Sequence, residues 1–130
     1  NLLIDSKEDW TLYMSLLDKA KLCIDVSHAE LWDYDPVQSI EDFWSQLNYV
    51  HLQDYSVCTV REPGNYNPEW VAVGVGECLD FAGVLNTLDE RNFTRWVTSC
   101  PGEPAYEGED AVSEAKRSAK MREYLRGLGY

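Results

Sequence analysis

Short apolar runs alternate along this chain with longer segments in which apolar residues recur every three or four positions. Each run ends on or near a polar residue, as is typical of strands buried in a parallel sheet. We predict four strands, at residues 1–5 ("NLLID"), 21–26 ("KLCIDV"), 48–55 ("NYVHLQDY") and 93–100 ("FTRWVTSC").

A helix is predicted after each strand. Ser6 or Asp9 caps the first helix, which ends near residues 19–21, and Asp35 and Pro36 begin the second. The third and fourth cover residues 79–91 and 109–128. The apolar positions expected on their core-facing sides are Trp10, Tyr13, Met14 and Leu17; Val37, Ile40, Phe43, Trp44 and Leu47; Phe81, Val84, Leu85 and Leu88; and Val112, Ala115, Ala119, Tyr124 and Leu125.

Residues 56–77 have weak periodicity and several prolines and glycines. We expect a functional or covering loop there.

This order predicts an α/β fold of four consecutive βα units with a parallel sheet and right-handed crossovers. A (β/α)8 TIM barrel takes about 250 residues, so a chain of 130 residues corresponds to half of one. We therefore expect a single half-barrel domain over residues 1–130, completed by another half or by a second copy. The chain opens without Met, which also fits a piece of a longer protein. The rival is a small open doubly wound sheet, for which no G-x-G-x-x-G nucleotide loop is present.

The composition of the chain limits which partners, cellular location and thiol state we expect. Eleven basic against 23 acidic residues give a net charge of −12, which disfavours nucleic acids and anionic membranes as partners. No apolar run approaches the length of a membrane span and no secretion signal leads the chain, so a cytoplasmic location is expected. The four cysteines form no C-x-x-C pair, and we expect reduced thiols, with Cys23 buried.

Candidate metal ligands occur at the predicted strand ends. The carboxyl ends of parallel strands converge on one mouth, where active sites form. The residues at or near these ends are Asp5, Asp25, His51 and Cys100. Asp and His suit Mn, Zn, Co or Fe, and Cys favours Zn. Taken alone, an aspartate at a strand end is more often a helix cap or loop acceptor, and a lone strand histidine is usually hydrogen-bonded in a core.

Further along the same segments, other residues are placed to contact a substrate. His28 and Asp54 follow two of the predicted ligands and are expected to bind substrate or orient the ligands. Trp32 and Trp70 are candidates for substrate walls, whereas Trp10 and Trp44 belong to helix faces.

The segments "LCIDVSHAELWDYDPVQSI", "NYVHLQDYS", "VGVGECLDFAGVLNTL", "FTRWVTS" and "SAKMREYLRGLGY" resemble the C-terminal half of the xylose isomerase-like TIM-barrel superfamily. That group includes sugar-phosphate isomerases and epimerases, inosose dehydratases and ketose 3-epimerases. The resemblance implies that Asp25 and His51 are divalent metal ligands and that His28 reaches toward the substrate.

The resemblance also implies two glutamates that both bind the metal and move a proton beside a carbonyl. Asp5 and Cys100 stand at those positions here, and Glu103 is an alternative for the second. Aspartate is shorter than glutamate by one methylene, about 1.5 Å, and a thiol has a reference pKa of roughly 8.5 against about 4.3 for Glu.

Three function classes follow. The first is a metal-dependent sugar or polyol isomerase or epimerase, with Asp25 and His51 holding Mn, Zn or Co and Asp5 as the base. The second is a non-catalytic half-barrel that serves in binding or assembly with a degenerate site. The third, a small flavodoxin-like receiver or ligand-binding module, lacks a visible fifth strand and phosphate loop.

Overall fold

The computed structural model describes residues 6–17, 19–62, 65–100 and 111–130. Their elements, in chain order, are α1 (Lys7–Ser15), β1 (Leu22–Asp25), α2 (Val26–Leu31), α3 (Pro36–Asp42), β2 (Leu47–Leu52), β3 (Asp54–Glu62), β4 (Asn65–Val71), α4 (Phe81–Glu90), β5 (Trp96–Ser99) and α5 (Ala111–Gly127). The predicted strand at residues 1–5 lies outside the described residues. No helix of the described residues is long and apolar enough to cross a membrane.

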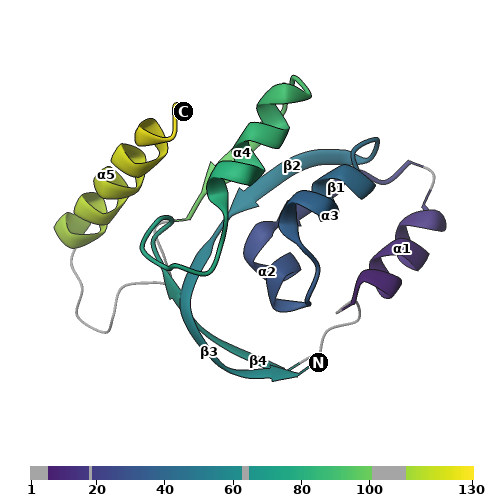
Figure 1. The fold of residues 1–130 in the computed structure, drawn as a ribbon, viewed down its shortest axis with the longest axis horizontal. Helices are drawn as coiled ribbons and strands as arrows, with labels where there is room; N and C mark the ends of the chain where they lie inside the picture. The colour runs from purple at the N-terminus through teal and green to yellow at the C-terminus, as the bar shows by residue number, and fades with distance from the viewer. Residues whose placement is uncertain (1–5, 18, 63–64, 101–110) are drawn as a thin grey trace.

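Three parallel strands form the sheet that organises the molecule. Their order is β1-β2-β5, so each strand pairs with the next parallel strand along the chain, as in a barrel wall. Between them the chain passes through helices that lie on one side of the sheet (Figure 1). The predicted α/β fold of consecutive βα units is confirmed, with the pattern of a partial TIM barrel.

Residues 56–77 do not form the predicted loop. Strands β3 and β4 build an antiparallel hairpin, with Asp54 opposite Val71 and Tyr55 opposite Trp70. The hairpin curves away from the parallel sheet and passes below α2 (Figure 1). Most of β3 beyond Tyr55 is exposed or half-buried, so its side chains carry no apolar alternation. Periodicity could not identify this element for that reason.

Two helix ends differ clearly from the predicted ones, and one helix was not predicted. Helix α1 ends at Ser15 instead of near residues 19–21, with Ser6 as its cap, and Tyr13 faces solvent. Helix α3 ends at Asp42, although Phe43 and Leu47 beyond it still pack in the core. Helix α2, directly after β1, was missed because it is only six residues long.

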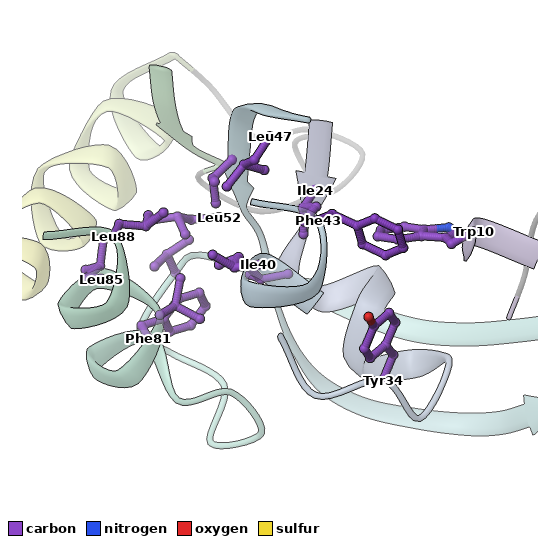
Figure 2. Packing of buried hydrophobic residues seen from close by; sticks show 14 of the residues in the cluster. Trp10, Ile24, Tyr34, Ile40, Phe43, Leu47, Leu52, Phe81, Leu85 and Leu88 are labelled. Carbon is purple, nitrogen blue, oxygen red and sulfur yellow. The ribbon is translucent and has the colours of Figure 1, made fainter. Parts of the chain in front are cut away.

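The core lies between the sheet and its helices (Figure 2). Ile24 and Val50 from neighbouring strands are fully buried and meet Ile40 of α3 and the predicted apolar face of α4. Burying residues of this size contributes about 1.5–3 kcal/mol each. Helix α5 adds Met121 as its buried residue, whereas Val112, predicted to face the core, is exposed.

Candidate functional site

The parallel register sets two rows of side chains across one face of the sheet. Asp25 pairs with His51, and His51 with Thr98. Two residues closer to the amino end of each strand, a second row consists of Cys23, Tyr49 and Trp96. Because side chains alternate between faces, both rows lie opposite the core residues Ile24 and Val50. Sequence reasoning missed Thr98 and Tyr49, which share a hydrogen bond of 2.6 Å; the two-residue period from His51 was the available signal.

Asp25 holds its carboxylate in a defined orientation. Its Oδ1 accepts hydrogen bonds from the backbone N–H of Ser27 at 3.0 Å, the Ser27 hydroxyl at 2.7 Å and the backbone N–H of His28 at 3.3 Å. These bonds make Asp25 the N-cap of α2. Its other oxygen, Oδ2, lies 2.8 Å from Nδ1 of His51. The structure thus brings these two predicted ligands together, through a short helix that orients one of them.

Of the other predicted ligands, the structure describes Cys100 and does not place it beside this pair. Asp5 and Glu103 lie outside the described residues. Cys100 is half-buried, and its backbone N–H donates to the carbonyl of Leu52 at 2.9 Å. Within the part of the chain that the structure describes, no group of three or more His, Cys, Asp or Glu side chains is placed to share an ion. Cys100 therefore does not complete a three-ligand site with Asp25 and His51 in this arrangement.

The predicted substrate residue His28 lies between two tryptophans. Its ring centroid is 6.1 Å from that of Trp32 and 5.3 Å from that of Trp70 on β4. Trp32 also packs edge-on against Trp10 of the core at 5.2 Å. All three rings of the cluster His28, Trp32 and Trp70 are half-buried. The structure thus groups the residues expected to contact substrate, with Trp70 supplied by the hairpin.

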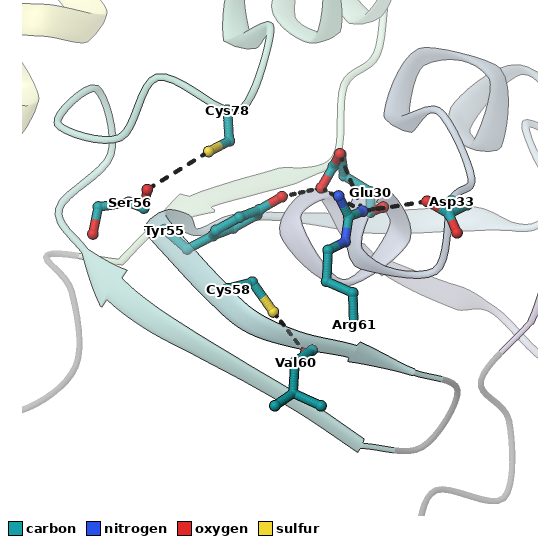
Figure 3. A network of polar contacts seen from close by, with 8 residues as sticks. All are labelled: Glu30, Asp33, Tyr55, Ser56, Cys58, Val60, Arg61 and Cys78. Atoms are coloured by element: carbon teal, nitrogen blue, oxygen red, sulfur yellow. Dashed lines mark hydrogen bonds and ion pairs between the residues drawn. The ribbon is translucent and has the colours of Figure 1, made fainter.

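A polar network ties the hairpin to α2 (Figure 3). The Tyr55 hydroxyl donates to the carboxylate of Glu30, and Arg61 donates to the Glu30 backbone carbonyl at 2.8 Å. The same guanidinium lies 3.4 Å from the Glu30 carboxylate and 3.3 Å from Asp33. Burial, and then the bond to Glu30, raises the pKa of Tyr55 well above its usual range. None of these residues was predicted, because the contact joins segments about 25 to 30 residues apart.

The Asp54 side chain has a structural role and is not accessible to a substrate. Its side chain is fully buried. The carboxylate accepts hydrogen bonds from the backbone N–H groups of Tyr55 at 2.8 Å and of Gly74 and Gly76 at 3.0 Å each. Its predicted contact with a substrate therefore does not fit this structure, since its oxygens face protein N–H groups and not solvent.

The sheet face that carries Asp25 and His51 is open at its amino-end row. Trp96 is 72% exposed. Cys23 is exposed as well, so its predicted burial is wrong: alternation turns it away from Ile24 and the core. Partial burial, and secondly the charge of Asp25, raises the pKa of the Cys23 thiol. The four cysteines of the chain form no disulfide.

Comparison with known proteins agrees with this architecture. A crystal structure of a xylose isomerase domain protein from Planctomyces limnophilus superposes with a TM-score of 0.67 and 20% identity, over 93% of this chain and 42% of that one. The chain therefore spans less than half of that structure. No curated protein matches the sequence. The family model described as "Xylose isomerase-like TIM barrel" matches residues 6–126. Nearly the whole chain thus belongs to the xylose isomerase-like TIM barrel family.

Proposed function

We propose that this chain is the metal-binding half of a sugar or polyol isomerase or epimerase, which transfers a proton at a carbon beside a carbonyl. The observation that carries the proposal is the approach of Asp25 Oδ2 to His51 Nδ1, 2.8 Å apart at neighbouring strand ends. This edge of a parallel sheet is where active sites of barrel enzymes form. The family's description as xylose isomerase-like supports the same reaction class.

The two side chains fit a divalent ion in type and in spacing. An imidazole nitrogen and a carboxylate oxygen, each about 2.1 Å from one ion, lie roughly 3.0–3.4 Å apart in tetrahedral or octahedral geometry. The distance of 2.8 Å between His51 and Asp25 needs only a small widening to reach that spacing. Asp25 and His51 would hold the ion, which when bound polarises a substrate carbonyl. Mn, Zn and Co suit these ligands.

Side chains of this chain would orient the metal ligand and the substrate and would move the proton. The bonds from Ser27 and His28 to Oδ1 of Asp25 keep Oδ2 directed at His51, as partners of metal ligands usually do. His28 lies one helical turn from Asp25 and would orient the substrate. Asp5 stays the candidate base that moves the proton, by its position in the sequence.

The proposal requires a second half-barrel. Among the described residues, β1 and β5 each pair with β2 alone, so they are the edge strands of the described sheet. Trp96 on the face next to His51 is exposed. Edges and apolar faces of this kind usually acquire a partner. We propose that another four-stranded half completes the barrel over this face. We also propose a reducing compartment such as the cytoplasm, which fits four cysteines that form no disulfide.

Titration calorimetry with Zn²⁺ and Mn²⁺ tests the metal site. The chain should bind about one ion, and His51→Gln should weaken binding by at least tenfold, since it removes one of the two protein ligands. His28→Gln is the matched control, because His28 and His51 are the two histidines of the chain. Equal binding by wild type and His51→Gln would contradict the proposal.

A non-catalytic half-barrel is the second candidate. It is favoured by one observation: the described residues offer two ligands and no third His, Cys, Asp or Glu beside them. In that case the Asp25–His51 bond is a structural link between β1 and β2. Absence of any ion uptake in the titration would support this candidate over the enzyme.

A further inference from the structure

Trp70 reaches the candidate site from an element outside the βα pattern. It stands on β4, directly opposite Tyr55 of β3, and its ring packs edge-on to that of Tyr55 at 6.3 Å. On its other side it lies 5.3 Å from the imidazole of His28. The hairpin therefore presents one indole to His28, on the helix that Asp25 caps.

The hairpin is held in this position by its own contacts to α2. Tyr55 is buried and donates to Glu30, two residues after His28 on the same helix. Arg61, further along β3, donates to the backbone carbonyl of Glu30 at 2.8 Å and contacts Asp33. One anchor, Tyr55, lies directly opposite Trp70, and the other, Arg61, lies further along β3. Together they place the Trp70 ring against His28 without a contribution from a ligand.

The charge around His28 is negative. Among residues 26–35 and 54–71, which cover α2, the turn after it and the hairpin, Arg61 is the single lysine or arginine. Its guanidinium already faces Glu30 and Asp33. The other cation that contacts this segment, Lys7, lies over the Tyr34 ring and pairs with Asp42 at 3.1 Å. A phosphate group beside His28 would therefore meet carboxylates, and both nearby cations already have carboxylate partners.

We infer that the cluster His28, Trp32 and Trp70 is a subsite for the apolar face of an uncharged sugar or polyol, with Trp70 as its specificity-determining residue. The inference rests on the proposed function and adds its substrate class. Indole rings supply large, rigid apolar area at small entropic cost, and ligand sites combine such walls with a few polar groups. Here the His28 imidazole is the polar group, and the indole of Trp70 excludes water from one side of it.

NMR of the imidazole rings can follow this subsite directly, because the chain has two histidines and therefore few imidazole signals to assign. The spectrum of His51→Gln identifies the His28 signal. Trp70→Leu should shift that signal, since it removes the ring current of an indole 5.3 Å away. Trp44→Leu, whose ring packs on Phe93 at 5.7 Å, is the matched control and should leave it unchanged.

Titration of the zinc-loaded chain with D-fructose and D-fructose 6-phosphate then tests the substrate class. D-fructose should shift the His28 signal. Trp70→Leu should weaken D-fructose binding about tenfold, which is the loss expected from one buried aromatic contact. Trp70→Phe should restore most of the lost affinity. Tighter binding of the phosphorylated sugar would overturn the inference. So would a His28 signal that no sugar moves, or equal D-fructose binding by wild type and Trp70→Leu.

The failures of the two proposals are distinguishable. If zinc fails to bind but D-fructose still shifts the His28 signal, the metal-dependent reaction is wrong and the subsite stands. If zinc binds through His51 and D-fructose shifts the His51 signal alone, the proposed function stands and the role of Trp70 is overturned.

Discussion

The carboxylate of Asp54 is fully buried and accepts hydrogen bonds from three backbone N–H groups, at Tyr55, Gly74 and Gly76. It thereby joins the start of the hairpin to the loop that follows it. Burial raises the pKa of Asp54, and the bonds from these N–H groups offset part of that rise. Its ionisation is therefore harder in the folded protein than in the unfolded chain.

This shift predicts how stability depends on pH. A carboxyl group whose pKa is raised on folding binds its proton more tightly in the native state, so its contribution to the free energy of unfolding falls as pH rises from about 4 to its folded pKa. Asp54→Asn, which cannot ionise, should cost most below pH 4 and progressively less across that window. Urea titrations at several pH values measure the difference. With Glu41→Gln, an exposed control, the difference should stay near zero; a penalty for Asp54→Asn that grows with pH would contradict the assignment.

Gly76 gives a second residue-scale prediction. A Cβ atom at this position would meet the backbone carbonyl of Tyr55 and the Asp54 carboxylate. Gly76→Ala should therefore lower the free energy of unfolding by about 1–3 kcal/mol, the usual cost of overpacking. Gly127→Ala has open space around it and should change stability by less than about 1 kcal/mol. Chemical denaturation compares the two, and equal effects would show that the loop moves to admit the methyl group.

Some residues of the candidate site could be identified from the sequence and others could not. Asp25 and His51 were identifiable because they end apolar runs, and parallel pairing placed them side by side. Glu30, Tyr55 and Arg61 were not, since their roles depend on a hairpin that the residue pattern did not reveal. Asp54 fitted the pattern of a site residue, but its side chain points into the protein. A pattern of residue types does not predict the direction of a side chain.

At the scale of elements, α2 and the hairpin determine the shape of the candidate site. Helix α2 begins on the Asp25 carboxylate and carries His28 and Glu30. The hairpin covers it through Tyr55 and Arg61 (Figure 3). Long helices with strong apolar faces, such as α4, were predicted within a residue or two. The short helix and the hairpin were not, because tertiary contacts and not local periodicity stabilise them.

The Tyr55–Glu30 bond should therefore stabilise the hairpin against α2. Tyr55→Phe removes the donor from a buried site and should cost about 1–2 kcal/mol, with faster amide hydrogen exchange in β3 and β4. Tyr13→Phe is the matched control, since its hydroxyl belongs to an exposed side chain on α1. Unchanged exchange in Tyr55→Phe would show that Arg61 alone holds the hairpin.

At the scale of the whole molecule, one face of the sheet exposes a large apolar side chain. The exposed Trp96 lies in the row below His51, where a closed barrel would have its interior. The number of βα units allowed the half-barrel to be predicted from length and pattern. The second half is a proposal, because its identity depends on surfaces beyond the described residues.

The exposed face predicts measurable apolar binding. The chain should bind a hydrophobic dye and associate with increasing concentration, and Trp96→Ser should reduce both several-fold while changing stability by less than about 0.5 kcal/mol. Val112→Ser, which removes an apolar side chain at an exposed position of α5, is the control. Sedimentation that shows a monomer at high concentration, together with no dye binding, would contradict a face made for a second half.

The most direct test of the account is an anomalous difference map from a crystal of the chain soaked with Zn²⁺ and measured at the zinc absorption edge. The account predicts a peak about 2.0–2.2 Å from both Asp25 Oδ2 and His51 Nδ1, and its loss in His51→Gln. A zinc-soaked crystal with the 2.8 Å contact between these atoms intact and no peak beside it would contradict the central claim.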